Sequence, residues 1–432
     1  MPSFIGFNPL HAMYRLLLFL LLMLPATHFA QGQIDLASYR EAVLRHSYPL
    51  QAARAHTSEM AAREAVAESN LLPRLSLSGN FNYALRHEEG IKPWNFSLQP
   101  EITAPLYEGG RLRATLRGAV LESSASREEE IATELEIRYA ADYAYWNLSA
   151  MEVLLNAQRR YVEIIRSLKR VIDERFHEGY IARGDVLMIE TRLSTANYEQ
   201  LVTEQRFEEA LHNFNILRGM PSDQPVTLAE SILDSLPLPQ RLGFEKILDA
   251  RPDFRSARLR SEIARNHIRI ERSNYNPQLH LGVRGAWHPQ APNRRGTTSL
   301  DGELFARLSI PIFGWGARRR TLDATRAAAL RVEWQQAELY EEILREERNG
   351  WSAVVESYAQ IATVSESLRI AGENLELGTY SYSEGLTTIL DVLQTQLNWI
   401  QIYTNAITAH FNYAVACSNY RRITGEQGDA DF

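Results

Sequence analysis

The strongest constraint on this fold is that the second half of the 432-residue sequence repeats the first. Prolines, glycines and short motifs recur 206 positions downstream: Pro105 and Pro311, Gly110 and Gly316, Glu178-Gly179 and Glu384-Gly385, Asp185-Val186-Leu187 and Asp391-Val392-Leu393, and Gly219 and Gly425. Further upstream, Pro73 recurs as Pro277, an offset of 204, so a two-residue insertion or deletion separates the paired segments. A constant offset over so long a span indicates a tandem duplication, and each half should fold as one copy of the same unit.

The N-terminus has the pattern of a targeting signal. A basic residue precedes an apolar run at residues 16–24, which is too short to span a membrane and suits the core of a signal peptide. Small residues favour cleavage after Gly32, although cleavage after Ala30 and a translation start at Met13 are also open. No cysteine stands directly after the apolar run, where a lipid would be attached. We therefore expect residues 1–32 to be a signal peptide for Sec export, without a lipid anchor.

Composition argues against several classes of protein. The net charge of −7 gives no reason to expect a nucleic-acid partner. The single cysteine, Cys417, permits no intramolecular disulfide and no cysteine-rich metal site, and we expect it to be a small buried residue. The histidines lack metal-ligand spacing, and Gly314-x-Gly316 lacks the third glycine of a nucleotide-binding loop. We predict no enzyme activity, no metal and no cofactor.

Four segments have the alternating pattern of β-strands with one apolar and one polar face. The apolar positions are Leu75, Leu77, Gly79, Phe81, Tyr83 and Leu85; Phe96, Leu98, Pro100, Ile102, Ala104 and Leu106; Leu279, Leu281, Val283, Gly285 and Trp287; and Leu300, Leu304, Ala306, Leu308, Ile310 and Ile312. Each segment spans about 10 residues, the length of a tilted transmembrane strand. They form two predicted hairpins, 75–106 and 278–312. An ordinary β-sandwich edge is the alternative, but two isolated hairpins offer it no further strands.

Proline is absent between residues 106 and 220 and after residue 311, which indicates long uninterrupted helices. Apolar residues in the first such stretch recur about every 3.6 positions, as in a coiled-coil shaft. We expect long helices at 111–178 and 317–378. Shorter helical segments should stack end to end beside them, namely 35–69 and 185–219 beside the first, and 246–273 and 391–424 beside the second. The proline-rich linker 221–245 should lie partway along the shaft.

Together these features resemble the TolC-type outer-membrane efflux family across essentially all of the mature chain. The residues that carry the resemblance are Leu72-Pro73-x-Leu75, Ala104-Pro105-Leu106-Tyr107-x-Gly109-Gly110, Phe176-x-x-Gly179 to Asp185-Val186-Leu187 and Leu217-Arg218-Gly219 in the first repeat, and Ile310-Pro311-Ile312-Phe313-Gly314-x-Gly316, Tyr382-x-x-Gly385 to Leu390-Asp391-Val392-Leu393 and Ile423-Thr424-Gly425 in the second. No single motif is diagnostic, but the double set in this order is highly specific. The repeats would then span 33–220 and 246–425, followed by a short tail at 426–432.

Physical reasoning and the resemblance lead to the same assembly. Four strands cannot close a membrane barrel, and an open sheet edge is not tolerated in lipid, so several chains must share one barrel. The resemblance implies a homotrimer with a 12-stranded transmembrane barrel and a periplasmic α-helical tunnel. The protein would be mainly α, with a β-barrel portion in the outer-membrane lipid.

The resemblance implies the exit duct of a tripartite efflux system, served by a periplasmic adaptor (membrane fusion protein) and an inner-membrane pump of the RND or ABC type. The same conduit could instead serve type I protein secretion. A non-channel periplasmic coiled-coil adaptor or scaffold is the alternative from a different class. It would explain the shaft and the signal peptide but leave the four amphipathic strands unexplained.

The resemblance also implies a gate at the periplasmic end of the tunnel. Asp391 takes the position of an acidic ring, and Gln394 stands where some members have a second acid. The gate ties would come from Tyr382 and Asp185. Thr387 replaces a basic residue that is often found in the family.

Three further residues have predicted roles near the helix-pair tips. Arg183 could substitute for the missing base, and Gly179 and Gly385 would mark the helix-pair tips into which an adaptor docks. The two acids also fit a structural role. Asp185 and Asp391 each follow a turn and begin a predicted helix, so both can be N-caps, and Asp391-x-x-Gln394 fits a variant capping box.

Overall fold

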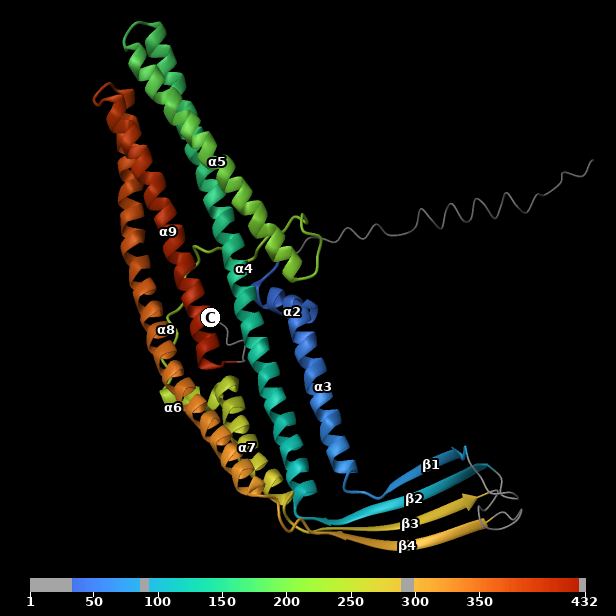
Figure 1. The fold of residues 1–432 in the computed structure, drawn as a ribbon. Helices are drawn as coiled ribbons and strands as arrows, with labels where there is room; N and C mark the ends of the chain where they lie inside the picture. Colours follow the sequence, from blue (N-terminus) through green and yellow to red (C-terminus); the bar gives the residue numbers. More distant parts are fainter. Residues whose placement is uncertain (1–32, 86–92, 289–298, 427–432) are drawn as a thin grey trace, which may run out of the picture.

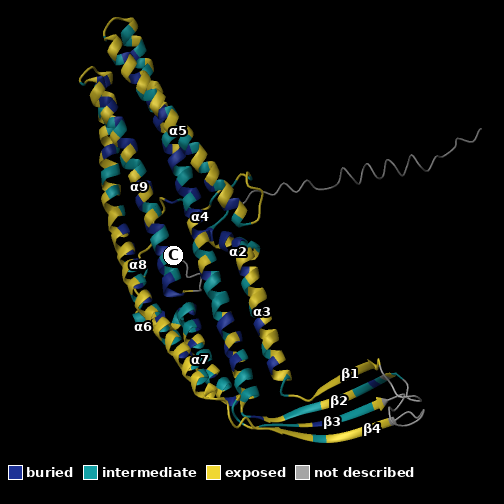
Figure 2. Ribbon diagram, in the orientation of Figure 1, coloured by how far each residue is buried: buried dark blue, intermediate teal, exposed yellow. Residues whose placement is uncertain are grey.

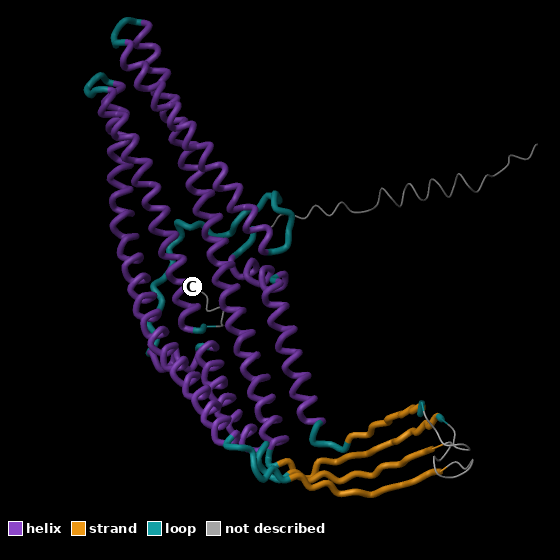
Figure 3. The backbone as a smooth tube through the Cα atoms, in the orientation of Figure 1, coloured by secondary structure: helices purple, strands orange, loops and turns teal. Residues whose placement is uncertain are grey.

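The computed structural model describes residues 33–85, 93–288 and 299–426, and within them the chain forms a long helical shaft with one four-stranded sheet at its end (Figures 1 and 3). The expected mainly helical fold with four strands is therefore confirmed. The predicted signal peptide at 1–32, most of the tail and the polar loops joining the paired strands lie outside the described residues. Among the residues described, no helix has both the length and the hydrophobicity that crossing a membrane would require.

Each repeat is organised around one helix of 67 residues, which at ~1.5 Å per residue is about 100 Å long. These two helices are α4 (Arg111–His177) and α8 (Ala317–Ser383). Shorter helices lie along them, with α3 (Tyr48–Ser69) and α5 (Arg183–Leu217) beside α4, and α7 (Pro252–Ser273) and α9 (Ile389–Thr424) beside α8 (Figure 1). The helices α2 (Leu36–His46) and α6 (Phe244–Ala250) complete the shaft.

Several helix boundaries differ from those expected. The helix expected to end at 378 continues to Ser383, because Gly378 packs against Thr395 of α9 and the stop signal is the left-handed Gly385. Helices expected from 185 and 391 each begin two residues earlier, at Arg183 and Ile389. The acidic residue therefore lies within the first turn of the helix in both repeats.

The interruptions in the short helices have local causes. Ser47 ends α2 and caps α3, with its hydroxyl accepting from the Leu50 N–H, and Pro49 lies in the first turn of α3, where its missing N–H costs no hydrogen bond. Pro252 plays the same part at the start of α7. The expected helix at 246–273 is thus two helices, and the linker ends at residue 243 rather than 245 because α6 begins at Phe244.

The linker between the repeats lies across the shaft. The Ile232 N–H donates to Ser149 Oγ of α4 at 2.8 Å, and the Tyr413 hydroxyl of α9 donates to the Pro237 carbonyl at 2.9 Å. Beneath it, Tyr39 stacks on Phe214 with ring centroids 3.9 Å apart, and both rings are fully buried. Cys417 is also buried, as expected. The linker therefore ties both repeats together partway along the shaft.

A buried ion pair joins α2 to α4 at the same level. Arg40 of α2 makes two hydrogen bonds to Asp142 of α4, at 2.5 and 2.8 Å, and the two side chains are only 10% and 5% exposed. Arg421 of α9 lies close enough for its pKa to respond to both charges, although desolvation is the main cause that lowers it. Asp142 therefore pairs with the buried Arg40 of its own repeat and also acts electrostatically on the half-buried Arg421 of the other repeat.

The sheet has the antiparallel order β1–β2–β3–β4. Its strands are β1 (Arg74–Tyr83), β2 (Trp94–Glu108), β3 (Gln278–His288) and β4 (Ser299–Ser309). The hairpin expected to end at 312 ends at Ser309, because the last residues of that segment have no strand beside them within the chain. Figure 2 shows that the outer strands are largely exposed, whereas buried residues gather along the shaft.

Candidate functional site

The sheet has one continuous apolar face, which is exposed to solvent in the single chain. Leu75, Ile102, Val283 and Leu304 are paired in sequence across all four strands and so form one apolar row. All four side chains are exposed. A contiguous apolar face of this kind normally marks a surface that contacts lipid or another protein.

The opposite face of the sheet is polar. The neighbouring row consists of Ser76, Glu101, Arg284 and Glu303, and Arg284 Nε donates to Glu101 Oε2 at 2.7 Å. Phe305 is the exception on this face. A Cβ added to Gly282 would lie only 2.3 Å from the Phe305 ring, so the ring fills the space that a side chain would need. The Arg284 guanidinium lies over the same ring. The sheet can therefore separate an apolar environment from an aqueous one.

At the end of the shaft away from the sheet, α4 and α5 form one helical hairpin, and α8 and α9 form the other. The tips of both helical hairpins have the same backbone turn. The Gly179 N–H donates to the Phe176 carbonyl and the Tyr180 N–H donates to the Arg175 carbonyl. The second repeat copies this pattern around Gly385. Both glycines have positive φ, 81° and 74°, and nothing lies near the position of an added Cβ. Glycine is therefore needed for its conformation and not for close packing.

Asp391 lies in the first turn of α9 and forms part of a capping box. The N-cap is Thr388, whose hydroxyl accepts from the Asp391 N–H while the Asp391 carboxylate accepts from the Thr388 N–H. The hydroxyls of Thr387 and Thr388 also donate to Asp391, at 3.0 and 2.6 Å. The prediction that Asp391 is itself an N-cap is therefore wrong, because the cap is three residues earlier. The Asp391–Gln394 capping box is wrong for the same reason.

These hydrogen bonds hold the pKa of the Asp391 carboxyl below its usual value, with Thr388 as the largest cause and Thr387 as the second. Because the pKa is depressed in the folded chain, the resulting stability is present above the ordinary pKa and is lost as the pH falls through the folded value. All the hydrogen bonds that this carboxylate accepts from described residues end on Oδ2. The other oxygen, Oδ1, therefore remains open to a cation at the exposed tip.

The two hairpins are tied together near their tips by Arg175 of α4. Arg175 Nη2 donates to the Ser383 carbonyl of α8 at 2.8 Å, and the guanidinium lies 4.9 Å from the centre of the Tyr382 ring. Tyr382 is buried, which raises the pKa of its phenol, and the nearby Asp185 acts in the same direction. The arrangement places a cation, an aromatic ring and a carboxylate where the repeats meet.

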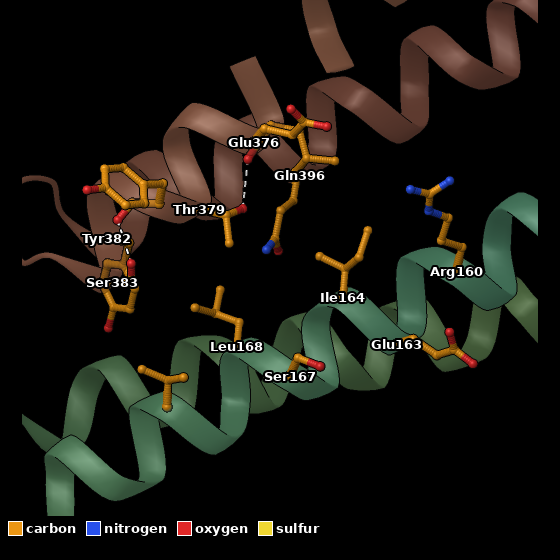
Figure 4. A pocket seen from close by; sticks show the side chains of 13 residues that line it. Arg160, Glu163, Ile164, Ser167, Leu168, Glu376, Thr379, Tyr382, Ser383 and Gln396 are labelled. Carbon is orange, nitrogen blue, oxygen red and sulfur yellow. Dashed lines mark hydrogen bonds between the residues drawn. The ribbon is translucent and has the colours of Figure 1, made fainter. Parts of the chain in front are cut away.

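An open groove with a volume of about 680 Å³ lies between the hairpins, just inside this tie. Figure 4 shows Gln396 pointing from α9 into the space between the hairpins, where Ile164 and Leu168 of α4 line the opposite wall. Gln396 is 1% exposed, and neither its amide nitrogen nor its amide oxygen has a hydrogen-bond partner among the described residues. An unsatisfied buried polar group costs about 1–3 kcal/mol. Gln396 is therefore a polar group within a largely apolar contact between the hairpins.

Most of the chain matches the model of one protein family. The model of the family described as outer membrane efflux protein matches residues 40–215 and 244–426, which correspond to the two repeats. The chain belongs to the outer membrane efflux protein family.

Three relatives of this efflux-family chain are distant in sequence but match over most of their length. Outer membrane protein TolC of Escherichia coli (strain K12) is 21% identical over 389 residues, which cover 84% of this chain and 77% of TolC. Nodulation protein T of Rhizobium leguminosarum bv. trifolii is 23% identical over 382 residues, covering 84% and 79%. The solved structure of the CmeC outer membrane channel of Campylobacter jejuni superposes with a TM-score of 0.79 at 18% identity, covering 90% of this chain and 85% of CmeC. At such identities the structural likeness establishes the fold.

The residues predicted for the gate of this efflux-family chain fall into separate groups. Tyr382 and Asp185 lie together at the tie, and Thr387 lies with Asp391 in the capping box. Asp185 is in the third position of α5, after the N-cap Ala182, so its prediction as an N-cap is wrong.

The remaining predicted residues lie elsewhere on the tips. Gln394 donates to Asn398 one turn along α9 and lines a separate groove facing α5. Arg183 lies over Phe176 of its own hairpin, and its proposed substitution for a missing base stays a prediction.

Two residues at the contact between the hairpins were not predicted from the sequence, Arg175 and Gln396. The only sequence signal for Arg175 is its position as a basic residue four places before the tip glycine. The second repeat does not share this signal, because Ser381 stands at the equivalent position. No group of three or more His, Cys, Asp or Glu side chains in the described parts of the chain is placed to hold a metal ion.

Proposed function

We propose that this chain is the outer-membrane exit duct of a tripartite efflux system. It would pass substrates from an inner-membrane pump and a periplasmic adaptor across the periplasm and the outer membrane. The observation that carries this proposal is the direct junction of an amphipathic four-stranded sheet with two helical hairpins about 100 Å tall, in a chain of the outer membrane efflux protein family. The proposal gives the chain no catalytic role.

The same observation supports a trimer. The strands β1 and β4 each have one free edge, and a sheet with open edges is not tolerated in lipid. Three copies would close a 12-stranded barrel with the apolar row toward lipid and the Glu101–Arg284 row toward the bore. The helical hairpins would then form a periplasmic tunnel closed at the tips by Tyr382, Asp185 and the Asp391 ring. Extraction in mild detergent as a monodisperse monomer would contradict the trimer.

A non-channel periplasmic adaptor or scaffold accounts for the structure less well. It would leave the exposed row Leu75–Ile102–Val283–Leu304 in water, where a large contiguous apolar surface favours aggregation. Fractionation separates the two proposals, because an outer-membrane duct is recovered with the outer membrane and an adaptor of this kind is not.

The physiological test is the phenotype of a deletion strain. We expect hypersensitivity to toxic compounds or metals with an unchanged set of secreted proteins, because an exit duct removes small molecules that its pump collects. The measurement is growth against a compound panel alongside the secreted-protein profile. Normal resistance combined with a missing secreted protein would instead identify a duct for type I protein secretion.

A second test concerns the acidic ring. We expect Asp391→Asn to lower cation selectivity and block by divalent cations in planar bilayers, because it removes one negative charge per chain at the narrow end. Thr388→Ala is the matched control, since it removes the cap hydroxyl but keeps the carboxylate, and it should lower only the stability of α9, by about 0.5–2 kcal/mol. Unchanged selectivity in Asp391→Asn would reduce Asp391 to a member of the capping box.

A further inference from the structure

The groove between the two helical hairpins contains a polar group that no described residue satisfies. Gln396 of α9 is 1% exposed, and its side chain points into the groove toward the wall formed by α4 (Figure 4). Neither the amide nitrogen nor the amide oxygen has a hydrogen-bond partner among the described residues. An amide offers a donor and an acceptor side by side, so an occupant that pairs with both would remove the cost of leaving them unpaired.

The two repeats differ at the positions around this amide. In the first repeat, Lys169 donates to Asp173 at 2.7 Å and lies 3.7 Å from the carboxylate of Glu190, so three charged side chains satisfy one another. The second repeat has lost every charge of this cluster but has kept one polar group, which now lacks its partner. The residues 206 positions later, all of which line the groove, are Leu375, Thr379 and Gln396.

The rest of the groove suits a largely apolar ligand. Its apolar lining residues belong to one buried cluster that both hairpins share, namely Ile164, Leu168, Val171 and Leu375. The volume of about 680 Å³ lies within the usual range of roughly 300–1,000 Å³ for small-molecule sites, which are lined mainly by apolar side chains with a few placed polar groups. The groove therefore has the size and the lining of a ligand site.

The charges at the edge of the groove favour an uncharged ligand. Glu163 and Glu376 are exposed carboxylates that line it and would repel an anion, whereas the guanidinium of Arg160 lies over the ring of Trp399. A cation would have to leave water beside the buried Leu168, and burying a charge without a partner is costly. A neutral ligand meets neither penalty.

We propose that this groove binds an uncharged, mainly apolar molecule that carries a lactam or another cis amide. The N–H and C=O of a cis amide lie on one edge, so they can pair with the Gln396 side-chain carbonyl and amide N–H in a ring of two hydrogen bonds. The apolar body of the ligand would lie against Ile164 and Leu168. The backbone amides of a docking helix, by contrast, are already paired within that helix.

Binding in this groove has a consequence for the tips. The ligand would contact α4 of one hairpin and α8 and α9 of the other, next to Tyr382. It would therefore stabilise the arrangement in which the two hairpins lie together. This consequence rests on the proposed function, in which the tips are the closed end of the duct, whereas the site itself does not.

The test of the site is a binding titration with phenanthridinone, a fluorescent tricyclic lactam. The protein is reconstituted in lipid nanodiscs, and empty nanodiscs serve as the blank. The matched ligand is N-methylphenanthridinone, which keeps the rings and the carbonyl but has no N–H donor. We expect the lactam to bind roughly tenfold more tightly, since this is the factor that one buried hydrogen bond contributes.

Three variants locate the effect. Gln396→Leu should remove the preference for the lactam, because leucine cannot pair with it, while both ligands still bind to the apolar wall. Leu375→Lys puts the first-repeat residue into the groove and should abolish binding of both ligands. Glu190→Gln is the matched control, because it places the same amide at the equivalent position of the first repeat and should leave the preference unchanged.

Two results would overturn the site. Equal affinity of the two ligands for the unaltered protein would leave the groove to solvent or to a partner of another kind, such as a helix of another protein. A preference that persists in Gln396→Leu would place the lactam elsewhere. Neither readout needs a trimer or an open channel, so failure of the proposed duct would leave the site standing.

The closing effect has its own measurement. Phenanthridinone should lower the open probability of Arg175→Ala channels in planar bilayers, because it joins the hairpins beside the contact that this change removes. The N-methyl derivative should lower it less. An unchanged open probability with intact binding would overturn the closing effect.

Discussion

Replacing Arg175 with alanine is expected to open the periplasmic end of the channel. The change removes the hydrogen bond to the Ser383 carbonyl and the cation over the Tyr382 ring, which join the two hairpins. A charged hydrogen bond contributes roughly 1.5–3 kcal/mol when shielded, and we take about 1 kcal/mol for this solvent-exposed one. Three copies in a trimer then amount to about 3 kcal/mol, or roughly a hundredfold shift from closed to open.

The measurement is open probability in planar bilayers, together with uptake of an antibiotic too large for the intact outer membrane. Arg170→Ala is the matched control. It removes an arginine from the same helix. Arg170 donates to Ser167 one turn away and, in the described part of the chain, makes no hydrogen bond or ion pair with the other hairpin. Equal behaviour of the two variants, or no change in either, would show that the Arg175 contact does not hold the tips closed.

Replacing Asp142 with asparagine is expected to give the largest loss of stability. The change removes the carboxylate that neutralises the buried Arg40, whose charge also acts on the half-buried Arg421. Removing one partner of a buried ion pair typically costs about 3–5 kcal/mol, because the remaining charge stays desolvated. The measurement is the free energy of unfolding in urea, or the thermal midpoint of the detergent-extracted protein.

Two further variants test whether the charge is the cause. Arg40→Met/Asp142→Leu removes both charges and should recover most of the loss, because apolar residues of similar volume can replace a buried pair. Glu366→Gln breaks an exposed pair with Arg369 and should change stability little. A double variant as unstable as Asp142→Asn would show that packing, and not the unbalanced charge, determines the stability at this joint.

Periodicity was enough to predict the architecture but not every boundary. The alternation of Leu75, Leu77 and their counterparts predicts strands, and the long proline-free stretches predict helices, because both patterns are local. The end of α8 was predicted at 378, whereas the helix continues to Ser383, before the left-handed Gly385. Gly378 lies inside the helix, where it packs against Thr395 on another helix. Information about that neighbour is not contained in the local sequence.

Some residues of the candidate gate could likewise be predicted from the sequence, and others could not. Tyr382, Asp185 and Asp391 were predicted from the resemblance to the efflux family. Arg175 was not, because its partner is a backbone carbonyl on the other hairpin, and a carbonyl leaves no signature in the sequence. Gln396 was missed because an amide on a helix is ordinarily exposed. Its burial follows only from the rotation of α9 toward α4.

The junction at Gly109 has a consequence for the symmetry of the assembled ring. A Cβ there would lie 2.5 Å from Asn276, so within a chain the two repeats meet too closely to admit any side chain. In the trimer that we propose, the equivalent junction between neighbouring chains would have to accommodate Trp315, which is 88% exposed in the single chain. Junctions that admit only glycine would then alternate around the axis with junctions that hold a tryptophan. A ring built from six copies of a duplicated unit would therefore have threefold and not sixfold symmetry.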